Sequence, residues 1–503
     1  MGPDASSPSA PARTLRWVRV AGPVAAVVVA WALPSAYTDA GGDLAPLTAE
    51  ARGVAGLAVW MALWWMTEAL PIYATALLPL AVLPLLGAAS IHDAAAPYAH
   101  PLIFLFFGGF VLAQAMERWG LHRRLAFRVL LLAGERPRNV VGAFMLVTAA
   151  LSMWVSNTAT AVMMLPIALS IADLLADRQR RGDEPLAICL LLGIAYGASI
   201  GGLGTLVGTP PNLFLASFVE SNLGVTISFG RWMAVGVPLV VVFLPLAWWL
   251  LTRRLFPLPD TPIHGGGEIA RRGLAELGPL NGGEKVTAVV FFLTAGAWIF
   301  RPLLADLQVA GTRPLAGLTD PGIAILAALL LFLLPAGRGQ GAVMDWETAV
   351  RLPWGLLLLF GGGLSLAAAL GSSGIAAFLG SRVGALAGLP SLLPVLAVTA
   401  MMVFLTEITS NTASTAALVP VLAALAVGLS LDPLLLVVPA AVAASCAFML
   451  PVATPPNAIV FGSGRIPMRA MVRAGLWLNL LAIALITAWL YLLAMPLLGI
   501  GDR

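Results

Sequence analysis

Runs of apolar residues separated by short polar segments occupy most of the chain. A bilayer core about 30 Å thick needs about 20 helical residues to cross it, so each long run predicts a membrane helix. Uninterrupted runs lie near residues 17–33, 52–70, 72–89, 101–120, 230–252, 286–304, 321–336 and 352–371, and further apolar stretches lie at 141–176, 187–220, 395–430, 434–463 and 472–498. This pattern predicts an all-α polytopic membrane protein.

Two pairs of polar motifs interrupt these apolar stretches. The tripeptide Ser-Asn-Thr at 156–158 recurs 254 positions later at 410–412. Each copy is followed by a second motif, which is Gly-Thr-Pro-Pro-Asn at 208–212 and Ala-Thr-Pro-Pro-Asn at 453–457. A single Ser-Asn-Thr in a membrane helix is commonly a hydrogen-bonding contact between helices. Its duplication, each time with a Thr-Pro-Pro-Asn partner, favours a functional site.

The interruptions predict two kinds of irregular element. An apolar run bent at Ser-Asn-Thr predicts a helical hairpin that enters and leaves the membrane on one side, over 141–176 and again over 395–430. A run broken by Thr-Pro-Pro-Asn predicts a pair of half-helices, over 187–220 and over 434–463, because proline ends the helical hydrogen-bond ladder. With hairpins that do not cross, we expect about eleven transmembrane helices.

The basic residues orient this topology, since Lys and Arg accumulate in cytoplasmic loops. With the N-terminus cytoplasmic and the C-terminus outside, only six of the 28 basic residues fall in segments assigned to the outside. These six are Arg52, Arg231, Arg301, Arg313, Arg382 and Arg503. The bias supports the predicted topology in a plasma (inner) membrane.

The two halves of the chain predict an inverted repeat. Basic clusters at 118–138 and 178–181 flank the first hairpin, which we therefore expect to open toward the cytoplasm. The second hairpin has almost no basic residues beside it, which is consistent with entry from the opposite face. Phe-Phe-Gly-Gly at 106–109 and Leu-Phe-Gly-Gly at 359–362 repeat at an offset of 253. The predicted parts are a cytoplasmic tail (1–16), a first membrane helix (17–33), a first repeat (52–252), a cytoplasmic linker (253–285) and a second repeat (286–498).

Composition and charge agree with a lipid bilayer as the environment. The 503 residues are 60% hydrophobic and 10% charged, with a mean hydropathy of +0.94, whereas a soluble domain has about 25% charged residues. The basic residues lie scattered between apolar runs rather than on one face, which argues against nucleic-acid binding. Cys189 and Cys446 both lie in apolar segments, and we expect them to be buried rather than disulfide-bonded.

The sequence lacks the motifs of the common membrane enzymes and pumps. None of the four histidines has metal-ligand spacing with Cys, Asp or Glu inside a predicted helix. There is no His-Glu-x-x-His, no Gly-x-Ser-x-Gly and no Walker-type glycine loop. We therefore expect no catalytic residues and no organic cofactor.

The four interrupted segments favour binding of ions. At a hairpin tip or a helix break, backbone groups leave the helical ladder and persist in a membrane only where a cavity or ligand satisfies them. Carbonyls with Ser hydroxyls and Asn amide oxygens form a neutral oxygen cage that suits a monovalent cation. Helix N-termini and the Asn and Thr donors suit an anion.

No Lys or Arg lies in the motif segments, so a divalent anion requires compensating charge from elsewhere. Cations bound beside the anion would supply it, and the binding of the two would then be coupled. Two intramembrane acids, Glu68 and Glu407, are a further functional signal. Because no proton-coupling partner is visible for either, we favour structural hydrogen bonding over a proton relay.

Three stretches, at 65–71, 151–160 and 406–412, resemble the divalent anion/sodium symporter family, whose members carry dicarboxylates, citrate or sulfate. The resemblance covers nearly the whole chain beyond the first helix. It implies an elevator-type transporter with two re-entrant hairpins, and a homodimer held by a scaffold domain.

The resemblance also implies the binding residues. Sodium ions would be held by Ser152, Ser156, Asn157 and Gly208 at one site and by Thr406, Thr409, Asn411 and Ala453 at another. The anion would contact Asn157, Thr158, Thr209, Asn411, Thr412, Thr454 and Pro455.

We therefore expect sodium-coupled symport of a divalent anion, with a C4-dicarboxylate such as succinate as the favoured substrate. A sodium-independent dicarboxylate exchanger and a sodium/sulfate symporter remain alternatives. A membrane receptor or scaffold that does not transport is a more remote one.

Overall fold

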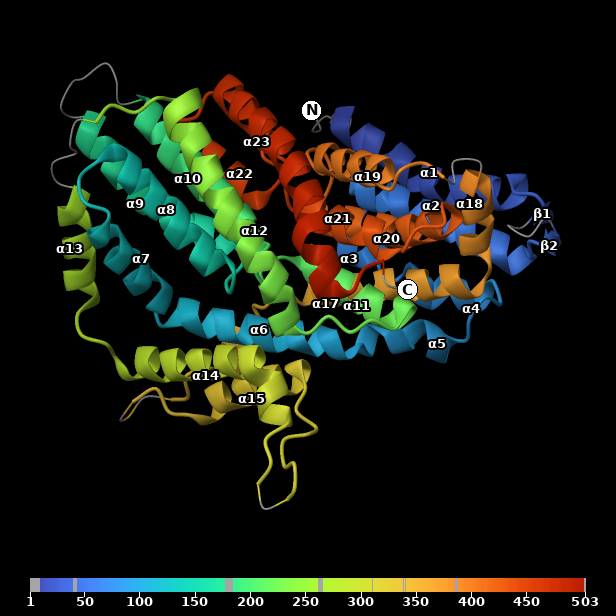
Figure 1. The fold of residues 1–503 in the computed structure, drawn as a ribbon, viewed down its shortest axis with the longest axis horizontal. Coiled ribbons are helices and arrows are strands. Elements are labelled where there is room, and N and C mark those ends of the chain that lie inside the picture. The colour runs from blue at the N-terminus through green and yellow to red at the C-terminus, as the bar shows by residue number, and fades with distance from the viewer. Residues whose placement is uncertain are drawn as a thin grey trace, which may run out of the picture.

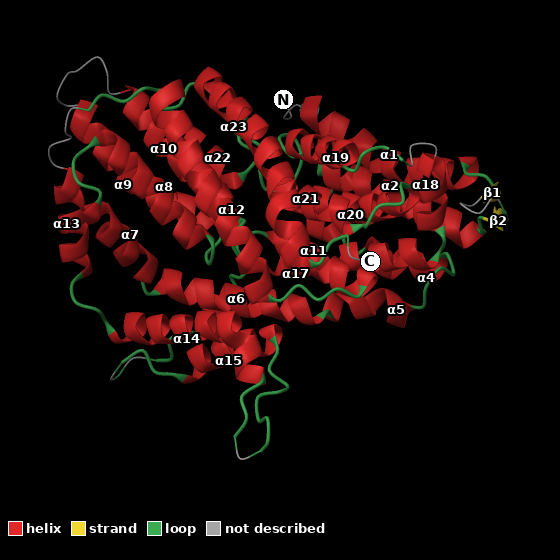
Figure 2. Cartoon of the chain, viewed as in Figure 1, coloured by secondary structure: helices red, strands yellow, loops and turns green. Residues whose placement is uncertain are grey.

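The computed structural model describes residues 10–38, 43–176, 184–260, 266–309, 311–337, 339, 341–384 and 388–501. Within these ranges the regular elements are helical, apart from one small antiparallel sheet of two strands (Figure 2). Residues 1–9 of the predicted tail and the basic cluster at 178–181 lie outside the described residues. Residues 10–16, predicted as tail, belong to the first helix.

The first half of the chain contains α1 (Ala10–Ala32), β1 (Ala36–Thr38), β2 (Leu44–Pro46), α2 (Ala49–Thr67), α3 (Ile72–Thr75), α4 (Leu78–Leu85), α5 (Ile91–Ala95), the 3-10 helix η1 (Ala96–Ala99), α6 (Pro101–Arg118), α7 (Leu121–Leu132), α8 (Pro137–Ser152), α9 (Asn157–Ala176), α10 (Glu184–Gly202), α11 (Pro210–Leu223), α12 (Phe229–Trp249), the π-helix η2 (Leu250–Leu255) and α13 (Gly266–Leu277).

The second half contains α14 (Gly282–Ala305), α15 (Asp320–Leu333), α16 (Trp346–Ala349), α17 (Trp354–Ser372), α18 (Ile375–Val383), α19 (Leu392–Leu405), α20 (Asn411–Gly428), α21 (Leu434–Ala444), α22 (Pro455–Phe461), α23 (Met468–Trp489), the π-helix η4 (Leu490–Ala494) and α24 (Met495–Leu498).

Seven helical segments of the described chain are long and apolar enough to cross a membrane. They are Ile91–Arg118, Pro185–Gly202, Phe229–Leu255, Gly282–Ala305, Trp354–Ser372, Asn411–Gly428 and Met468–Leu498. Shorter apolar helices accompany them, as expected for a chain with interrupted runs. The helices therefore agree with a multi-pass membrane protein, and the number of eleven crossings stays a prediction.

The span predicted at 72–89 is wrong as a single uninterrupted helix. It consists of α3 and α4 with a turn at 76–77 between them. Pro79 lies in the first turn of α4, where its missing N–H would be without a helical partner in any case. The carbonyl of Ala76, freed by the turn, accepts a hydrogen bond from the Tyr98 hydroxyl.

The helices form two side-by-side groups joined along one edge (Figure 1). Helices α7 to α10 and α12 lie in one group, and α1, α2 and α17 to α20 lie in the other. Helix α6 runs along the edge of both groups, and α15 packs against it on the outside. Helix α10 packs on α8, α9 and α22, and it is buried along nearly its whole length.

Bends and close contacts recur at the same offset as the tripeptides. Gly120 (φ +73°) precedes α7, and Gly374 (φ +83°) precedes α18, 254 positions later. Both have the left-handed backbone that glycine adopts most readily. Gly108 and Gly362 share the offset, and a Cβ atom at either would come within 2.5 Å of a backbone carbonyl oxygen, that of Ala324 in α15 or of Ala76 in the turn after α3. These matches support an internal repeat, whereas its orientation in the membrane is a prediction.

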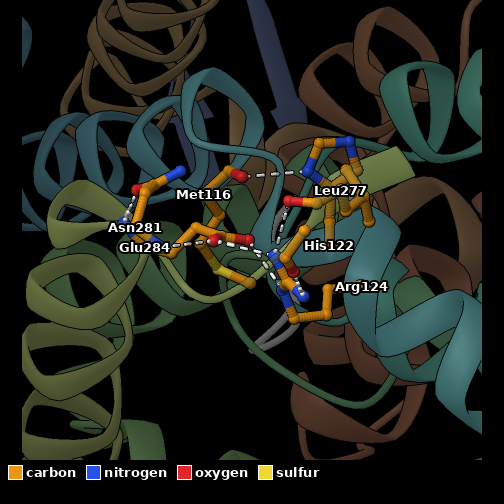
Figure 3. Close-up of polar contacts among 7 residues, drawn as sticks. Met116, His122, Arg124, Leu277, Asn281 and Glu284 are labelled. Carbon is orange, nitrogen blue, oxygen red and sulfur yellow. Dashed lines mark hydrogen bonds and ion pairs between the residues drawn. The ribbon is translucent and has the colours of Figure 1, made fainter. Parts of the chain in front are cut away.

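A buried ion pair fixes α7 against the start of α14 (Figure 3). The Arg124 guanidinium donates to both carboxylate oxygens of Glu284, at 2.9 and 3.0 Å. It also donates to the carbonyls of Leu277, the last residue of α13, and Gly278, which follows it. Glu284 completes a capping box with Asn281. The segment predicted as a linker therefore contains a helix that is tied to α7.

His122, near the start of α7, lies beside this ion pair (Figure 3). Its Nδ1 donates to the Met116 carbonyl at 2.9 Å, which links α7 back to α6 across the bend at Gly120. Burial lowers the pKa of His122, so the imidazole is neutral at physiological pH.

We predict that Arg124→Met and Glu284→Met each lower the free energy of unfolding by about 3–5 kcal/mol, because each strands a buried charge. The double variant should lose less free energy of unfolding than either single variant, because it leaves no unpaired buried charge. Denaturant titration in detergent measures this. The matched control is Arg271→Met on α13, whose exposed pair with Glu268 should contribute less than about 1 kcal/mol. If each single variant loses as little free energy of unfolding as the control variant does, the buried pair does not stabilise the fold.

Candidate functional site

Each tripeptide lies at the turn between two helices of a predicted hairpin. Helix α8 ends at Ser152 and α9 begins at Asn157, and in the second half α19 ends at Leu405 and α20 begins at Asn411. The serine before each asparagine caps the second helix: Ser156 Oγ accepts from the Ala159 amide at 3.2 Å, and Ser410 Oγ accepts from the Ala413 amide at 3.4 Å. The helix breaks therefore fall where the polar motifs predict them.

The second motifs lie at the other two breaks. Thr209 precedes α11 and Thr454 precedes α22, each as the N-cap residue, with the two prolines in the first turn. Proline suits this position because its ring fixes the helical φ and the missing N–H has no helical partner there. The loops before them, at 203–209 and 445–454, are irregular backbone; nearly all of the first is buried, whereas Val452 of the second is exposed.

The asparagine of each Thr-Pro-Pro-Asn holds the loop before it. Asn212 Nδ2 donates to the carbonyls of Gly202 at 3.1 Å and Thr205 at 2.9 Å. Asn457 Nδ2 donates to the carbonyls of Ala447 at 3.2 Å and Leu450 at 3.0 Å. All three positions differ by 245 between the halves. The same amide clamp therefore stabilises both loops.

Three asparagine oxygens at these breaks are buried and have no hydrogen-bond partner among the described residues. They are the Oδ1 atoms of Asn212, Asn411 and Asn457. A buried acceptor without a partner costs about 1–3 kcal/mol, so a ligand or water that satisfies it is strongly favoured. All three are uncharged oxygens, the kind of group that binds a hard monovalent cation.

Glu407 links the turn between α19 and α20 to the loop at 445–454 by hydrogen bonds. Its carboxylate accepts from the backbone amides of Phe448 at 2.7 Å, Met449 at 2.9 Å and Leu450 at 2.9 Å, and from Asn479 Nδ2 at 2.7 Å. The side chain is buried and has no cationic partner within the described chain. These contacts agree with the structural role favoured from the sequence.

One cavity of about 910 Å³ is lined by both tripeptides and both second motifs. Every predicted anion contact lines it: Asn157, Thr158, Thr209, Asn411, Thr412, Thr454 and Pro455. Of the predicted sodium ligands, Ser156, Asn157, Gly208, Thr409, Asn411 and Ala453 line it as well. Segments that are more than 250 positions apart in sequence therefore meet at one space.

Two predicted sodium ligands do not line this cavity. Ser152 is buried behind Asn157, and its hydroxyl donates to Asn157 Oδ1 at 2.5 Å. Thr406 is buried, and its hydroxyl donates to the Met402 carbonyl at 2.9 Å. Ser152 therefore contacts a site residue directly, whereas the Thr406 hydroxyl is used within its own helix.

The cavity lining also contains residues that the motifs do not indicate. Aromatic and polar side chains come from α3 and α6, and two charged ones come from the turns after α2 and α16. These residues are Tyr73, Phe106, Phe110, Gln114, Glu68 and Arg351. Among the described lining residues, Glu68 and Arg351 are the only charged ones. Arg351 therefore supplies the positive charge that the motif segments lack.

The sequence indicates Glu68 as a candidate functional residue but gives no such signal for Arg351. Glu68 was marked by its place at the end of an apolar run, and its backbone has the left-handed φ of +49° that is rare outside glycine. Arg351 has no local motif, because it lies at a helix-to-helix turn like many other basic residues. Only its position in space indicates a role.

Comparisons with known proteins show which family the chain resembles over nearly its whole length. A family model described as the sodium:sulfate symporter transmembrane region matches residues 14–499. The chain is 44% identical over 459 residues to a sodium-dependent dicarboxylate transporter, SdcS, of Staphylococcus saprophyticus, covering 89% of this chain and 88% of that protein. It is 42% identical to SdcS of Staphylococcus aureus (strain USA300), covering 89% and 87%.

Two solved structures have a similar fold. The YdaH transporter of Alcanivorax borkumensis aligns with a TM-score of 0.56 at 17% identity, over 96% of this chain and 98% of that one. MtrF of Neisseria gonorrhoeae aligns with a TM-score of 0.59 at 15% identity, over 98% and 97%. At these identities the likeness concerns the fold alone.

We predict that Glu407→Ala lowers the stability of the protein, because it strands buried donors that each cost about 1–3 kcal/mol without an acceptor. Glu407→Gln retains one acceptor oxygen and should lose less. Thermal unfolding in detergent measures both. Glu68→Ala is the matched control, since this exposed acid has no hydrogen bond or ion pair in the described chain. Equal losses for Glu407→Ala and Glu68→Ala would contradict the structural role.

Proposed function

Because the chain belongs to the sodium:sulfate symporter family, we propose that it is a secondary active transporter that couples sodium entry to dicarboxylate uptake across the plasma membrane. The observation that carries this proposal is the single cavity lined by both tripeptides and both second motifs. A C4-dicarboxylate such as succinate is the favoured substrate, since the relatives at 42–44% identity are named dicarboxylate transporters.

The proposed sodium ligands are uncharged oxygens. At the first site they are the Asn157 amide oxygen, the Ser152 and Ser156 hydroxyls and the Gly208 carbonyl. At the second they come from Thr406, Thr409, Asn411 and Ala453. The buried, unpartnered Asn411 Oδ1 supports the second site, because a bound cation would satisfy it.

The proposed anion contacts are hydrogen-bond donors beside these cations. The Asn157 and Asn411 amides can donate through Nδ2, and the hydroxyls of Thr158, Thr209, Thr412 and Thr454 line the same space. Pro455 forms part of the wall. The sodium ions neutralise the dianion, and the anion in turn raises the affinity for sodium by linkage.

We extend the proposal to an inverted-repeat fold and an elevator movement in a homodimer, as the family resemblance implies. The recurrence of left-handed glycines at Gly120 and Gly374 supports two hinge-like bends at matched positions. The cavity is lined by the motif segments together with residues of α2, α3, α6 and α17, so movement of the motif segments relative to these helices would expose or enclose a bound ligand.

The test is uptake of radiolabelled succinate into proteoliposomes with and without an inward sodium gradient. We expect accumulation only with the gradient, and no accumulation by Asn157→Ala or Asn411→Ala, which each remove a residue shared by a cation and the anion. Uptake that needs internal dicarboxylate instead of sodium would indicate an exchanger. Competition by sulfate stronger than by succinate would favour a sulfate symporter, and no uptake of either would refute transport.

A second prediction concerns Arg351, the cationic residue of the described cavity lining. Arg351→Gln should raise the KM for succinate by about tenfold, equivalent to 1.4 kcal/mol, because the dianion loses an attractive charge. The sodium activation curve at saturating succinate should stay unchanged. Arg313→Gln is the matched control, as Arg313 lies in an exposed turn and pairs with Asp306. An unchanged KM for Arg351→Gln would show that this charge does not act on the substrate.

A further inference from the structure

A hydrogen bond between two hydroxyls joins the two helix breaks. Thr209 directly precedes α11, and Ser445 directly follows α21, which packs against α11. The two hydroxyl oxygens lie 3.2 Å apart, and both side chains are buried. Thr209 lines the cavity, whereas Ser445 is not among its described lining residues. A buried serine from the second half of the chain therefore holds the hydroxyl of a residue that the first half contributes to the cavity.

The hydroxyl of Thr209 has a different partner from that of its counterpart, Thr454. The two threonines lie 245 positions apart, and their backbones nearly coincide, with φ of −147° and −141° and ψ of 140° and 150°. Thr454 Oγ1 accepts from the Asn457 amide at 3.3 Å and so caps α22. Thr209 makes no such side-chain cap on α11. Because the backbones agree, the difference lies in the side chain, which has Ser445 as its partner.

Position 445 has no hydroxyl counterpart in the first half. The residue 245 positions before Ser445 is Ile200, a buried apolar residue of α10. The amide clamps of Asn212 and Asn457, by contrast, occur in both halves. The loop structure that the halves share therefore does not require a serine at this position.

The two hydroxyls carry two protons, and the bond between them uses only one. If Thr209 donates, the proton of Ser445 has no acceptor within the described chain, and a buried donor without a partner is costly. If Ser445 donates, the remaining proton belongs to Thr209, the residue that lines the cavity. An anion in the cavity can accept that proton. A bound anion therefore favours donation by Ser445.

We propose that Ser445 is a positioning residue for the anion: its hydroxyl donates to Thr209 Oγ1 and leaves the Thr209 proton for a carboxylate oxygen of the substrate. A hydroxyl that accepts a hydrogen bond also donates more strongly. Thr454 reaches the same state by another route, since its oxygen accepts from the Asn457 amide. Each threonine oxygen thus has a donor, and each threonine keeps a proton for the anion. This inference rests on the proposed function.

The test measures succinate uptake into proteoliposomes at saturating sodium. Ser445→Ala leaves Thr209 Oγ1 without its donor, so the KM for succinate should rise at least about threefold while kcat stays within about twofold of wild type. The matched control is Ser217→Ala on α11, which removes another buried hydroxyl. That hydroxyl donates to the Leu213 carbonyl of its own helix at 2.9 Å, so the KM of the control should equal that of wild type.

A double-variant cycle tests whether Ser445 acts through Thr209. Thr209→Val removes the hydroxyl and keeps the branched side chain, and it should raise the KM at least about tenfold, equivalent to 1.4 kcal/mol. Adding Ser445→Ala to Thr209→Val should raise the KM no further, because no hydroxyl is left to orient. If Ser445→Ala raises the KM by the same factor with and without the Thr209 hydroxyl, the positioning role is wrong.

A purely structural link between the two loops would act on sodium as well, since the proposed sodium ligands Gly208 and Ala453 lie in these loops. Thermal stability of the purified protein is therefore titrated with NaCl, balanced by choline chloride, in the absence of dicarboxylate. A bound cation stabilises the folded state, and Ser445→Ala should have the same sodium dependence as wild type. A shift in its sodium dependence as large as the shift in KM would overturn the positioning role.

The outcomes separate this inference from the function on which it rests. A wild-type protein without sodium-driven succinate uptake refutes the proposed function, and with it this role of Ser445. A wild type that transports succinate, with an unchanged KM for Ser445→Ala, overturns the role of Ser445 alone. If Ser445→Ala does not fold, Ser445→Cys takes its place, because a thiol fills a similar space and donates only weakly. The same rise in KM is then expected, and a wild-type KM overturns the role.

Discussion

The structure depends on how backbone groups are satisfied where helices break inside an apolar environment. Each unsatisfied group there costs several kcal/mol, so an irregular loop persists only with dedicated partners. Asn212 and Asn457 supply donors to loop carbonyls, and Glu407 supplies an acceptor to three consecutive loop amides. Among the buried side-chain atoms of the described residues, the amide oxygens of Asn212, Asn411 and Asn457 remain without a partner at the breaks. These acceptors suit a ligand that is positively charged or donates hydrogen bonds.

The distribution of charge around the cavity follows from this arrangement. The motif segments contribute uncharged oxygens and amides, and the one described cationic side chain of the lining, Arg351, lies outside them, in the turn after α16. An arginine fixed among the motifs would hold a dianion without any cation and would uncouple the two. Under the proposed mechanism, Arg351 attracts the anion, while binding among the motif segments requires sodium because these segments contribute no cationic side chain.

The sequence predicted the breaks well and the contacts between them poorly. The helix ends at Ser152 and Asn157, and at Leu405 and Asn411, follow from local chemistry, because a capping serine and the polar tripeptide act within a few residues. The partners of Glu407 lie 41 to 72 positions away, and Arg351 has no local signal at all. The turn at 76–77 was missed because the carbonyl of Ala76 is satisfied by Tyr98, a contact that an apolar run does not reveal.

The two halves differ at positions that the repeated motifs bring into correspondence. At the tripeptide offset of 254, Glu407 corresponds to Met153, so only the second half has a buried carboxylate at its tip. In the first half the tip and the loop are joined by the Thr205 hydroxyl, which donates to the Met153 carbonyl. The two hairpin turns are therefore held to their loops by different groups, a threonine hydroxyl in the first half and a carboxylate in the second.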